Sequence, residues 1–561
     1  MGMINTRWIL AGLLPLVLAV FVRAWFAAAF LESPLFTPLE GQHDRTLYHE
    51  AAREVADGKH VPDGSFQHMP LYPWVLGAGY AAFGDDLRVS ATLGIACDVV
   101  TVLLIVLLAA RLGARPIPAG VVAGLYALYP LAIVYATLTM PNTLNTLLLT
   151  ATALALTGLH DRKTGAWAGV GLLCGITALG FAGMLPVAVV FLLWRLTNGW
   201  RRDPGPWKGI LLFAVAFALP LIPVAVHNTR AEGAFVLLTT HGGFNFYMGN
   251  HERATGYPVR VRDFRMTARA MLEDAHRAAE QETGRTLTRA ESSEWWFARG
   301  RAFWRESPGE AVMLTLKKAA LFWNFREVDD LRMLEQLRLT DGLFRTPVWP
   351  GFAGFGLLGL IGLLYARGSA AAKTVLLTGM ASIVLFFITA RYRLTFVPLM
   401  AALGAAGLAG LWAKFRARDL QLWWLIPAAV IVAYPFPVRD LRPFDYLNAS
   451  VQVLGAGRPE YALALAREGL EIDPRNADLW FAGGNAMAAL ERYEEAVDYF
   501  AQAVRANPAH AIARYNLALS LARLGRVAEA VAVLEEWVTH APHDRRAAAL
   551  YRDLKAVLEA P

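Results

Sequence analysis

One short acidic segment stands out as able to do chemistry. It is Glu40-Gly41-Gln42-His43-Asp44, which follows soon after an apolar run from Trp8 to Phe30. A carboxylate placed there can act as a general base that takes a proton from an attacking hydroxyl or amine. Asp44 can also be the N-cap of an amphipathic helix that begins at Arg45. Both roles can hold together, because a helix N-terminus is a natural site for an anion.

Two arginines form a second candidate cluster. Arg391 and Arg393 lie at the start of a late apolar segment, at the end where the topology derived below does not favour basic residues. A guanidinium donates two parallel hydrogen bonds to a phosphate, and a departing lipid phosphate carries charge that must be stabilised. The alternative is that both side chains reach to the lipid headgroups. We expect one of the two to face a site.

Further polar residues interrupt or flank the apolar runs. Asp98 lies in the middle of one, where a carboxylate is costly unless it is paired. A structural pairing, with Arg23 of the first run for example, is favoured over catalysis. Asn142 and Asn145 could line the mouth of a cavity, but hydrogen bonding between helices is the favoured interpretation. His68 is a candidate for contact with a substrate.

The composition explains what must position these residues. Of 561 residues 56% are hydrophobic, and the mean hydropathy is +0.38, which indicates a polytopic membrane protein with a polar appendage. Apolar runs of about 20 residues predict about eleven spans, near 8–30, 89–111, 116–136, 141–159, 166–182, 184–197, 209–227, 349–366, 374–390, 394–412 and 421–436. The net charge of +7 is attributed to basic residues in short loops and not to nucleic-acid binding.

Basic residues in alternate short loops give the orientation. The loops expected to be cytoplasmic carry Arg111, Arg115, Arg162, Lys163, Arg195, Arg201, Arg202, Lys208, Arg367, Lys373, Lys414, Arg416 and Arg418. The loops 31–88 and 228–348, and everything after about 437, then face the opposite side, which predicts a multi-pass inner-membrane protein with periplasmic loops. The loop 228–348 is too long for a passive connection. Its tryptophans and glycines suit interfacial helices and a cover over a site, or else a folded outer subdomain.

The C-terminal part repeats with a period of 34 residues. Asp473-Pro474, Asn507-Pro508 and Ala541-Pro542 are spaced in this way, and small residues recur where the two helices of a hairpin must touch. This is the tetratricopeptide signature. It predicts an α-solenoid over 441–561, with three repeats over about 442–543 and a capping helix over 544–559. Such a solenoid presents a groove for a peptide or partner protein, and a stabilising cap without a ligand is the alternative.

Four motifs in residues 8–440 have an order and sidedness that resemble a known family. They are Gly41-Gln42-His43-Asp44 with Tyr48 and Ala52 downstream, Met69-Pro70-Leu71-Tyr72-Pro73, Gly242-Gly243-Phe244-Asn245-Phe246-Tyr247-Met248-Gly249-Asn250, and Arg391-Tyr392-Arg393-Leu394-Thr395-Phe396-Val397-Pro398. Together they resemble the GT-C glycosyltransferases of the protein O-mannosyltransferase and lipid A aminoarabinose transferase type, family 39. The resemblance implies an all-α, polytopic GT-C bundle over 1–440 that transfers a sugar from a polyprenyl phosphate to a protein or envelope acceptor.

By the same resemblance Asp44 takes the place of the catalytic carboxylate, and Arg391 and Arg393 remain the candidates for binding the donor phosphate by the charge argument given above. The candidate substrate contacts are Glu40, His43, Tyr48, His68, Tyr72, Asn142, Asn245 and Asn250. Relatives often have a second carboxylate adjacent to the first, whereas here it is Glu40, four residues earlier. We therefore expect a metal-independent site without a cofactor. A divalent ion held by the Glu40, His43 and Asp44 side chains is the less favoured alternative. Cys97 and Cys174 lie in apolar runs and give no metal signature.

Two other classes of protein compete with this interpretation. An O-antigen-ligase-like transferase would use a lipid pyrophosphate-linked glycan, but its chemistry sits in a late large loop, and the early position of Asp44 argues against it. A membrane scaffold or transporter would recruit partners through the repeats without catalysis. A transporter is expected to show paired broken helices in two related halves, which the sequence does not show.

Overall fold

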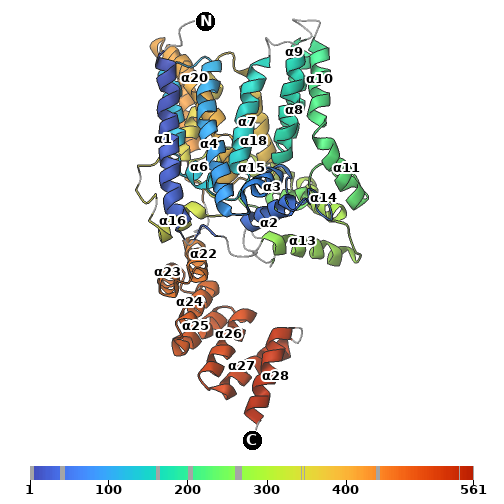
Figure 1. The fold of residues 1–561 in the computed structure, drawn as a ribbon, viewed down its shortest axis with the longest axis vertical. Coiled ribbons are helices and arrows are strands. Elements are labelled where there is room, and N and C mark those ends of the chain that lie inside the picture. The colour runs from blue at the N-terminus through green and yellow to red at the C-terminus, as the bar shows by residue number, and fades with distance from the viewer. Residues whose placement is uncertain are drawn as a thin grey trace. The chain divides into compact units, whose positions relative to one another are not determined.

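The computed structural model describes residues 6–33, 35–37, 44–159, 164–199, 206–258, 264, 268–342, 344–346, 348–437, 442–541 and 544–559. In these ranges the chain is helical and has no strand, as expected (Figure 1). It forms two compact units. The first comprises Met1–Leu31, Glu40–Leu331 and Thr346–Phe436, and the second comprises Glu32–Leu39, Arg332–Arg345 and Pro437–Pro561.

Helices cover every apolar segment in which a span was predicted, but most are short. Those long and apolar enough to cross a membrane are α1 (Thr6–Leu31), α4 (Leu87–Arg111) and α20 (Val397–Arg416). The pair α10 (Pro206–Ala218) and α11 (Leu221–Glu232) is a fourth if it counts as one span bent by 46°. The other apolar helices are α5 (Pro116–Ala127), α6 (Pro130–Tyr135), α7 (Asn142–Thr157), α8 (Gly165–Gly180), α9 (Met184–Gly199), α17 (Phe352–Tyr365), α18 (Ala370–Val384) and α21 (Leu425–Ala433). The count of eleven spans therefore stays a prediction.

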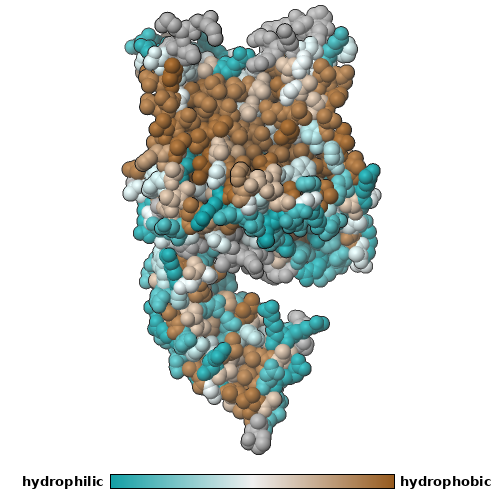
Figure 2. Space-filling model, in the orientation of Figure 1, coloured by the Kyte–Doolittle hydropathy of each residue, from teal (hydrophilic) through white to brown (hydrophobic). Residues whose placement is uncertain are grey.

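The surface of the first unit carries the apolar band that a bilayer requires. Large hydrophobic side chains point outward along its helices, for example Phe21 of α1 at 68% exposed and Leu211 of α10 at 55%. Figure 2 shows them as a broad brown band with hydrophilic surface at both edges. An exposed apolar surface of this extent is typical of a membrane protein and not of a soluble monomer.

The predicted outer loops fold into short helices at one end of the first unit (Figure 1). These are α2 (Asp44–Ala56), α3 (Leu71–Phe83), α12 (Gly242–Gly249), α13 (Ala268–Thr283), α14 (Arg289–Glu306) and α15 (Pro308–Trp323). Helix α14 begins with a capping box formed by Thr288 and Glu291. Phe244, Met248 and Trp296 form a small apolar core between these helices. Much of the segment 228–348 is thus folded into helices around a small apolar core.

The second unit contains the predicted helical hairpins. Its helices are α16 (Met333–Thr340), α22 (Arg442–Gly455), α23 (Pro459–Ile472), α24 (Ala477–Ala489), α25 (Tyr493–Ala506), α26 (Ala511–Arg523), α27 (Val527–His540) and α28 (Arg545–Glu559). Ala462, Ala496 and Ala530, spaced 34 residues apart, are all fully buried. Side chains of this size allow the two helices of each hairpin to approach closely.

Helix α16 packs against α22, so a piece of the large outer loop belongs to the repeat unit. Arg332 donates two hydrogen bonds to Asp445, from Nε to Oδ1 at 2.7 Å and from Nη2 to Oδ2 at 2.6 Å. The hydroxyl of Tyr461 donates to the carbonyls of Leu339 and Thr340 at 2.8 and 2.9 Å. The 34-residue period did not predict this docking, because α16 lies outside the repeats.

Replacing Asp445 with asparagine should therefore destabilise the repeat unit. The two side chains of the Arg332–Asp445 pair are only 12% and 4% exposed, and removing one partner of a buried pair costs about 3–5 kcal/mol. Limited proteolysis of the full chain at increasing temperature should show earlier cleavage of the repeat unit. Arg492→Met removes the exposed Arg492–Glu495 pair and is the matched control, for which we expect no measurable loss. Equal behaviour of the two variants would contradict the anchoring role of Asp445.

Candidate functional site

Asp44, at the first residue of α2, is paired with Arg391. Arg391 Nη1 donates to Asp44 Oδ2 at 2.8 Å, and Nη2 donates to Asp330 Oδ2 at 2.6 Å. One guanidinium thus joins two carboxylates from different outer loops. The Arg391 side chain is 10% exposed, whereas those of Asp44 and Asp330 are 25% and 22% exposed. Both carboxylates can therefore be reached from outside while the cation between them is nearly enclosed.

The backbone around Arg391 is fixed by neighbouring segments. Arg391 lies on the five-residue helix α19 (Ala390–Leu394). The amide of Ala390 donates to the Val328 carbonyl at 2.8 Å, which holds α19 against the segment that carries Asp330. Asn142 Nδ2 of α7 donates to the Arg391 carbonyl at 3.1 Å. Asn142 therefore positions Arg391, in agreement with the hydrogen bonding between helices favoured from the sequence.

Arg393, also predicted to bind phosphate, has a structural role. It is 1% exposed, and Nη1 donates to the carbonyls of Leu321 and Asn324 at 3.1 and 2.7 Å. Its guanidinium also lies 3.9 Å from the ring centre of Phe352. These bonds occupy carbonyls at the C-terminal end of α15, which a helix leaves without partners. These contacts give Arg393 a place in the fold, whereas Arg391 bonds with Asp44; phosphate binding by either arginine stays a prediction.

A row of aromatic rings lies beside Asp44. Tyr48 is one turn further along α2, and its ring contacts those of His68 and Tyr72 edge-on, each with centroids 5.5 Å apart. Burial, together with the Asp44 carboxylate, raises the pKa of Tyr48, so its hydroxyl stays protonated. Burial lowers the pKa of His68, against the opposing effect of Asp44. The fold therefore brings three of the predicted substrate contacts together near the candidate base.

Three further residues at the candidate site were not predicted from the sequence: Asp329, Asp330 and His241. Burial raises the pKa of Asp330, and the proximity of the Asp44 carboxylate adds to the increase. Asp329 is 1% exposed and accepts a hydrogen bond from the Tyr135 hydroxyl at 2.7 Å. The available signal was the adjacent carboxylate pair Asp329-Asp330 shortly after an apolar helix. Nothing in the spacing, however, indicated that this pair would meet a residue of the first loop.

The remaining candidates separate into three groups. Glu40 and His43 lie outside the described residues. Asn245 is half-buried on α12. Asn250 is 1% exposed and uses its whole amide within the protein: Nδ2 donates to two backbone carbonyls, and Oδ1 accepts from Trp304 and Lys318. These bonds hold Asn250 within the fold, and its contact with a substrate stays a prediction.

Asp98 also has the structural role predicted for it. Arg23 of α1 binds it in a fully buried ion pair, with Nη2 2.5 Å and Nε 2.7 Å from Asp98 Oδ2. The Tyr126 hydroxyl donates to the other carboxylate oxygen at 2.7 Å. Because both oxygens are occupied by partners from α1 and α5, this carboxylate joins helices inside the bundle.

The structure does not test the expected metal independence. Among the described residues, no three His, Cys, Asp or Glu side chains are arranged to hold a metal ion. Glu40 and His43 are not among these residues, so a site without a metal stays a prediction.

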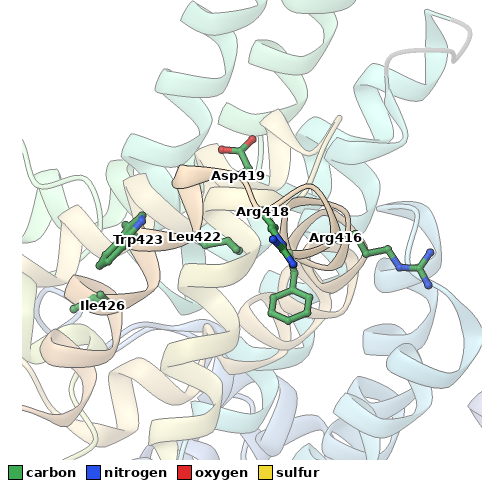
Figure 3. A pocket seen from close by; sticks show the side chains of 7 residues that line it. Arg416, Arg418, Asp419, Leu422, Trp423 and Ile426 are labelled. Atoms are coloured by element: carbon green, nitrogen blue, oxygen red, sulfur yellow. The ribbon is translucent and has the colours of Figure 1, made fainter.

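A surface pocket lies elsewhere, where α20 meets the 3-10 helix η2 (Leu420–Trp424) (Figure 3). Its lining residues are Phe415, Arg416, Arg418, Asp419, Leu422, Trp423 and Ile426. Its one carboxylate, Asp419, accepts from Lys414 Nζ at 2.6 Å and caps η2 through the Gln421 amide. Arg416 and Arg418 of this lining belong to a loop that the predicted topology assigns to the cytoplasm. The carboxylate of Asp419 is already bonded to Lys414 and to the Gln421 amide, so the pocket offers no carboxylate that is available as a general base.

Comparisons with known proteins confirm the resemblance inferred from the motifs. Residues 67–223 match the family described as dolichyl-phosphate-mannose-protein mannosyltransferase. Residues 453–508 and 481–545 match the tetratricopeptide repeat. The chain therefore carries a segment that is similar to this family, of the GT-C type, and C-terminal tetratricopeptide repeats. The first match contains His68 and Asn142 but ends before Arg391 and begins after Asp44. A search of curated proteins gave no match.

Solved structures with a similar arrangement are distant in sequence. The Archaeoglobus fulgidus oligosaccharyltransferase tethered to an acceptor peptide is 14% identical, with a TM-score of 0.35. The match covers 76% of this chain and 55% of that protein, so the chain spans about half of its length. ArnT from Cupriavidus metallidurans bound to undecaprenyl phosphate is 16% identical, with a TM-score of 0.30 and coverage of 70% and 78%. Its apo form is 15% identical, with a TM-score of 0.30 and coverage of 69% and 77%.

Proposed function

We propose that this protein is a membrane glycosyltransferase that moves a sugar from a polyprenyl phosphate to an acceptor on the extracytoplasmic face. The observation that carries the proposal is the shared guanidinium of Arg391, with a reachable carboxylate on each side. A candidate general base, Asp44, is therefore in direct contact with a candidate phosphate-binding side chain, Arg391. The family match over 67–223 supports the same class of reaction.

The proposed reaction uses these groups in one displacement step. An acceptor hydroxyl or amine attacks the anomeric carbon of the sugar as Asp44 takes its proton. The bond from that carbon to the phosphate oxygen breaks, and its electron pair leaves with the lipid phosphate. Arg391 stabilises the charge that develops there. Its Nε is buried and has no hydrogen-bond partner among the described residues, so it can donate to a phosphate oxygen without first giving up a carboxylate.

A reconstitution experiment tests this function. The full chain in lipid nanodiscs is supplied with a set of undecaprenyl phosphate-linked sugars and with envelope extract as the acceptor source. We expect release of undecaprenyl phosphate from at least one donor and transfer of its sugar to an extract component. Comparison of envelope glycans from cells with and without the gene then identifies the acceptor. If no donor is consumed and no glycan changes, the protein is not this kind of enzyme.

The repeat unit is assigned to the same side of the membrane as the large outer loop. Helix α16 belongs to that loop in sequence and packs within the repeat unit. A single compact unit cannot lie on both sides of a bilayer. The side assigned in this way does not depend on how many spans follow residue 346, whereas the side assigned from the charge pattern does. On the extracytoplasmic side the repeats recruit the acceptor or a partner protein. A stabilising cap without a ligand is the alternative role of the repeats.

Protease treatment of intact spheroplasts should accordingly release fragments of the tail. The exposed connections between the hairpins, such as the one near Arg475, are the expected cleavage sites. Fragments are detected with an antibody against the C-terminus, and a cytoplasmic protein serves as the control for intact membranes. A tail that is protected until the membrane is breached would contradict both the sidedness of the repeats and that of the large loop.

A further inference from the structure

Two loops of the first unit, far apart in sequence, are hydrogen-bonded together beside the candidate site. The amide of Phe66 donates to Asn228 Oδ1 at 2.8 Å, and the Thr240 amide donates to the Phe66 carbonyl at 3.3 Å. Asn228 Nδ2 donates in turn to the Leu238 carbonyl at 2.8 Å. These bonds fix the segment that ends at His68 against the segment that ends at His241.

The result is a pair of imidazoles in edge-to-face contact. The rings of His68 and His241 are perpendicular, with centroids 5.1 Å apart. Neither ring forms a hydrogen bond with another residue in the part of the chain that the structure describes. Other histidines do find such partners: His49 bonds with the Tyr80 hydroxyl at 2.8 Å, and His227 with the Gly64 carbonyl at 2.9 Å.

A third polar group next to the pair also lacks a partner. Thr240 is 6% exposed, and its buried hydroxyl oxygen has no hydrogen bond within the described residues. Leaving a buried polar group unsatisfied costs about 1–3 kcal/mol, so such groups call for an explanation. The half-buried rings of His68 and His241 lie beside this hydroxyl, so a ligand that bonds with the two imidazoles and with Thr240 would give all three groups a partner.

The chemistry of the pair defines what that partner can be. Burial lowers the pKa of His68 and that of His241, so both rings are neutral at pH 7. A neutral imidazole has one N–H donor and one acceptor nitrogen. That combination matches an alcohol, which donates and accepts at a single oxygen. A neutral ring adds no positive charge to attract an anion, so an uncharged alcohol is the better match.

We propose that His68 and His241 form a hydroxyl-binding subsite that orients a polyol for the reaction at Asp44. Tyr48 links the two, because it lies one turn from Asp44 on α2 and contacts the ring of His68. This inference rests on the proposed glycosyltransferase function. The hydroxyls can come from the sugar of the donor or from the acceptor, and the experiment distinguishes these two sources.

The test uses the full chain in nanodiscs and the donor that the wild-type protein consumes. We expect His241→Ala and His68→Ala each to raise the KM of one substrate about tenfold, which corresponds to about 1.4 kcal/mol, the upper part of the range for one hydrogen bond. A raised donor KM assigns the subsite to the sugar, and a raised acceptor KM assigns it to the acceptor. His241→Gln, which keeps a donor and an acceptor, should recover part of the loss.

Binding of undecaprenyl phosphate without a sugar provides the second readout. It should be unchanged in all these variants, because the phosphate does not use the imidazoles. Weakened binding of this probe, or unchanged KM values for both substrates, would overturn the subsite. His49→Gln, on α2 but bonded within the protein, is the control and should keep both KM values. A wild-type protein that consumes no donor would instead contradict the proposed function, so the two failures are distinguishable.

Discussion

Asp44→Asn should abolish sugar transfer while the protein stays folded. A side chain acting as general base typically contributes about 10²–10⁴-fold to a rate, and an amide cannot take the proton. The effect on stability should be small, because the Asp44 side chain is 25% exposed and Arg391 keeps its second partner, Asp330. The measurements are the initial rate of donor consumption and the thermal unfolding temperature.

Asp330→Asn is the matched control for this experiment. It removes the other carboxylate bound by the same guanidinium, at a similar exposure of 22%. If the only role of these carboxylates were to hold Arg391, both variants would lose activity to the same extent. If Asp44→Asn keeps more than about a tenth of the wild-type transfer rate and Asp330→Asn keeps less, then Asp330 and not Asp44 is the general base.

Replacing Arg391 with methionine should weaken donor binding about 100-fold. Charge-assisted hydrogen bonds are worth about 1.5–3 kcal/mol each, and the substitution removes the whole donor set. Arg391→Lys should recover only part of the affinity, because an ammonium keeps the charge but loses the planar fork. Titration with undecaprenyl phosphate measures this directly. Normal affinity in Arg391→Met would exclude Arg391 as the phosphate ligand.

The variant Arg393→Met distinguishes a role in binding the donor phosphate from a role in the stability of the fold. Arg393 is buried against the carbonyls at the end of α15, so we expect a lower unfolding temperature and unchanged affinity for undecaprenyl phosphate in the protein that remains folded. The Arg391 variant should instead lose affinity for undecaprenyl phosphate. If Arg393→Met instead lost affinity without loss of stability, the two roles would have been exchanged.

Patterns that are local in sequence predicted the fold and part of the site. The 34-residue period placed the buried alanines of the hairpins, and the cost of an unpaired carboxylate in a membrane led to the pairing of Asp98 with Arg23. The motif that contains Arg391 and Arg393 could not tell them apart. Residues two apart on a helix point to different sides, and only the surrounding packing decides which side is the site.

The sequence could not predict which segments far apart in the chain come into contact. Asp330 joins the site because the segment after α15 is fixed to α19 through Val328 and Ala390. Asn250 belongs to a matching motif, yet its amide is consumed by Trp304, Lys318 and backbone carbonyls. A motif records that a residue is needed. It does not record whether the residue serves the substrate or the fold.

The docking of α16 into the repeat unit affects how the protein is made. Synthesis proceeds from the N-terminus, so Arg332 and the apolar side of α16, including the buried Leu337, emerge about a hundred residues before α22 exists. During that interval the contacts that α22 supplies, including the carboxylate of Asp445, are still missing. A nascent chain stalled before residue 442 should therefore be unusually prone to aggregation, and the repeats act as the last part needed to complete a loop translated much earlier.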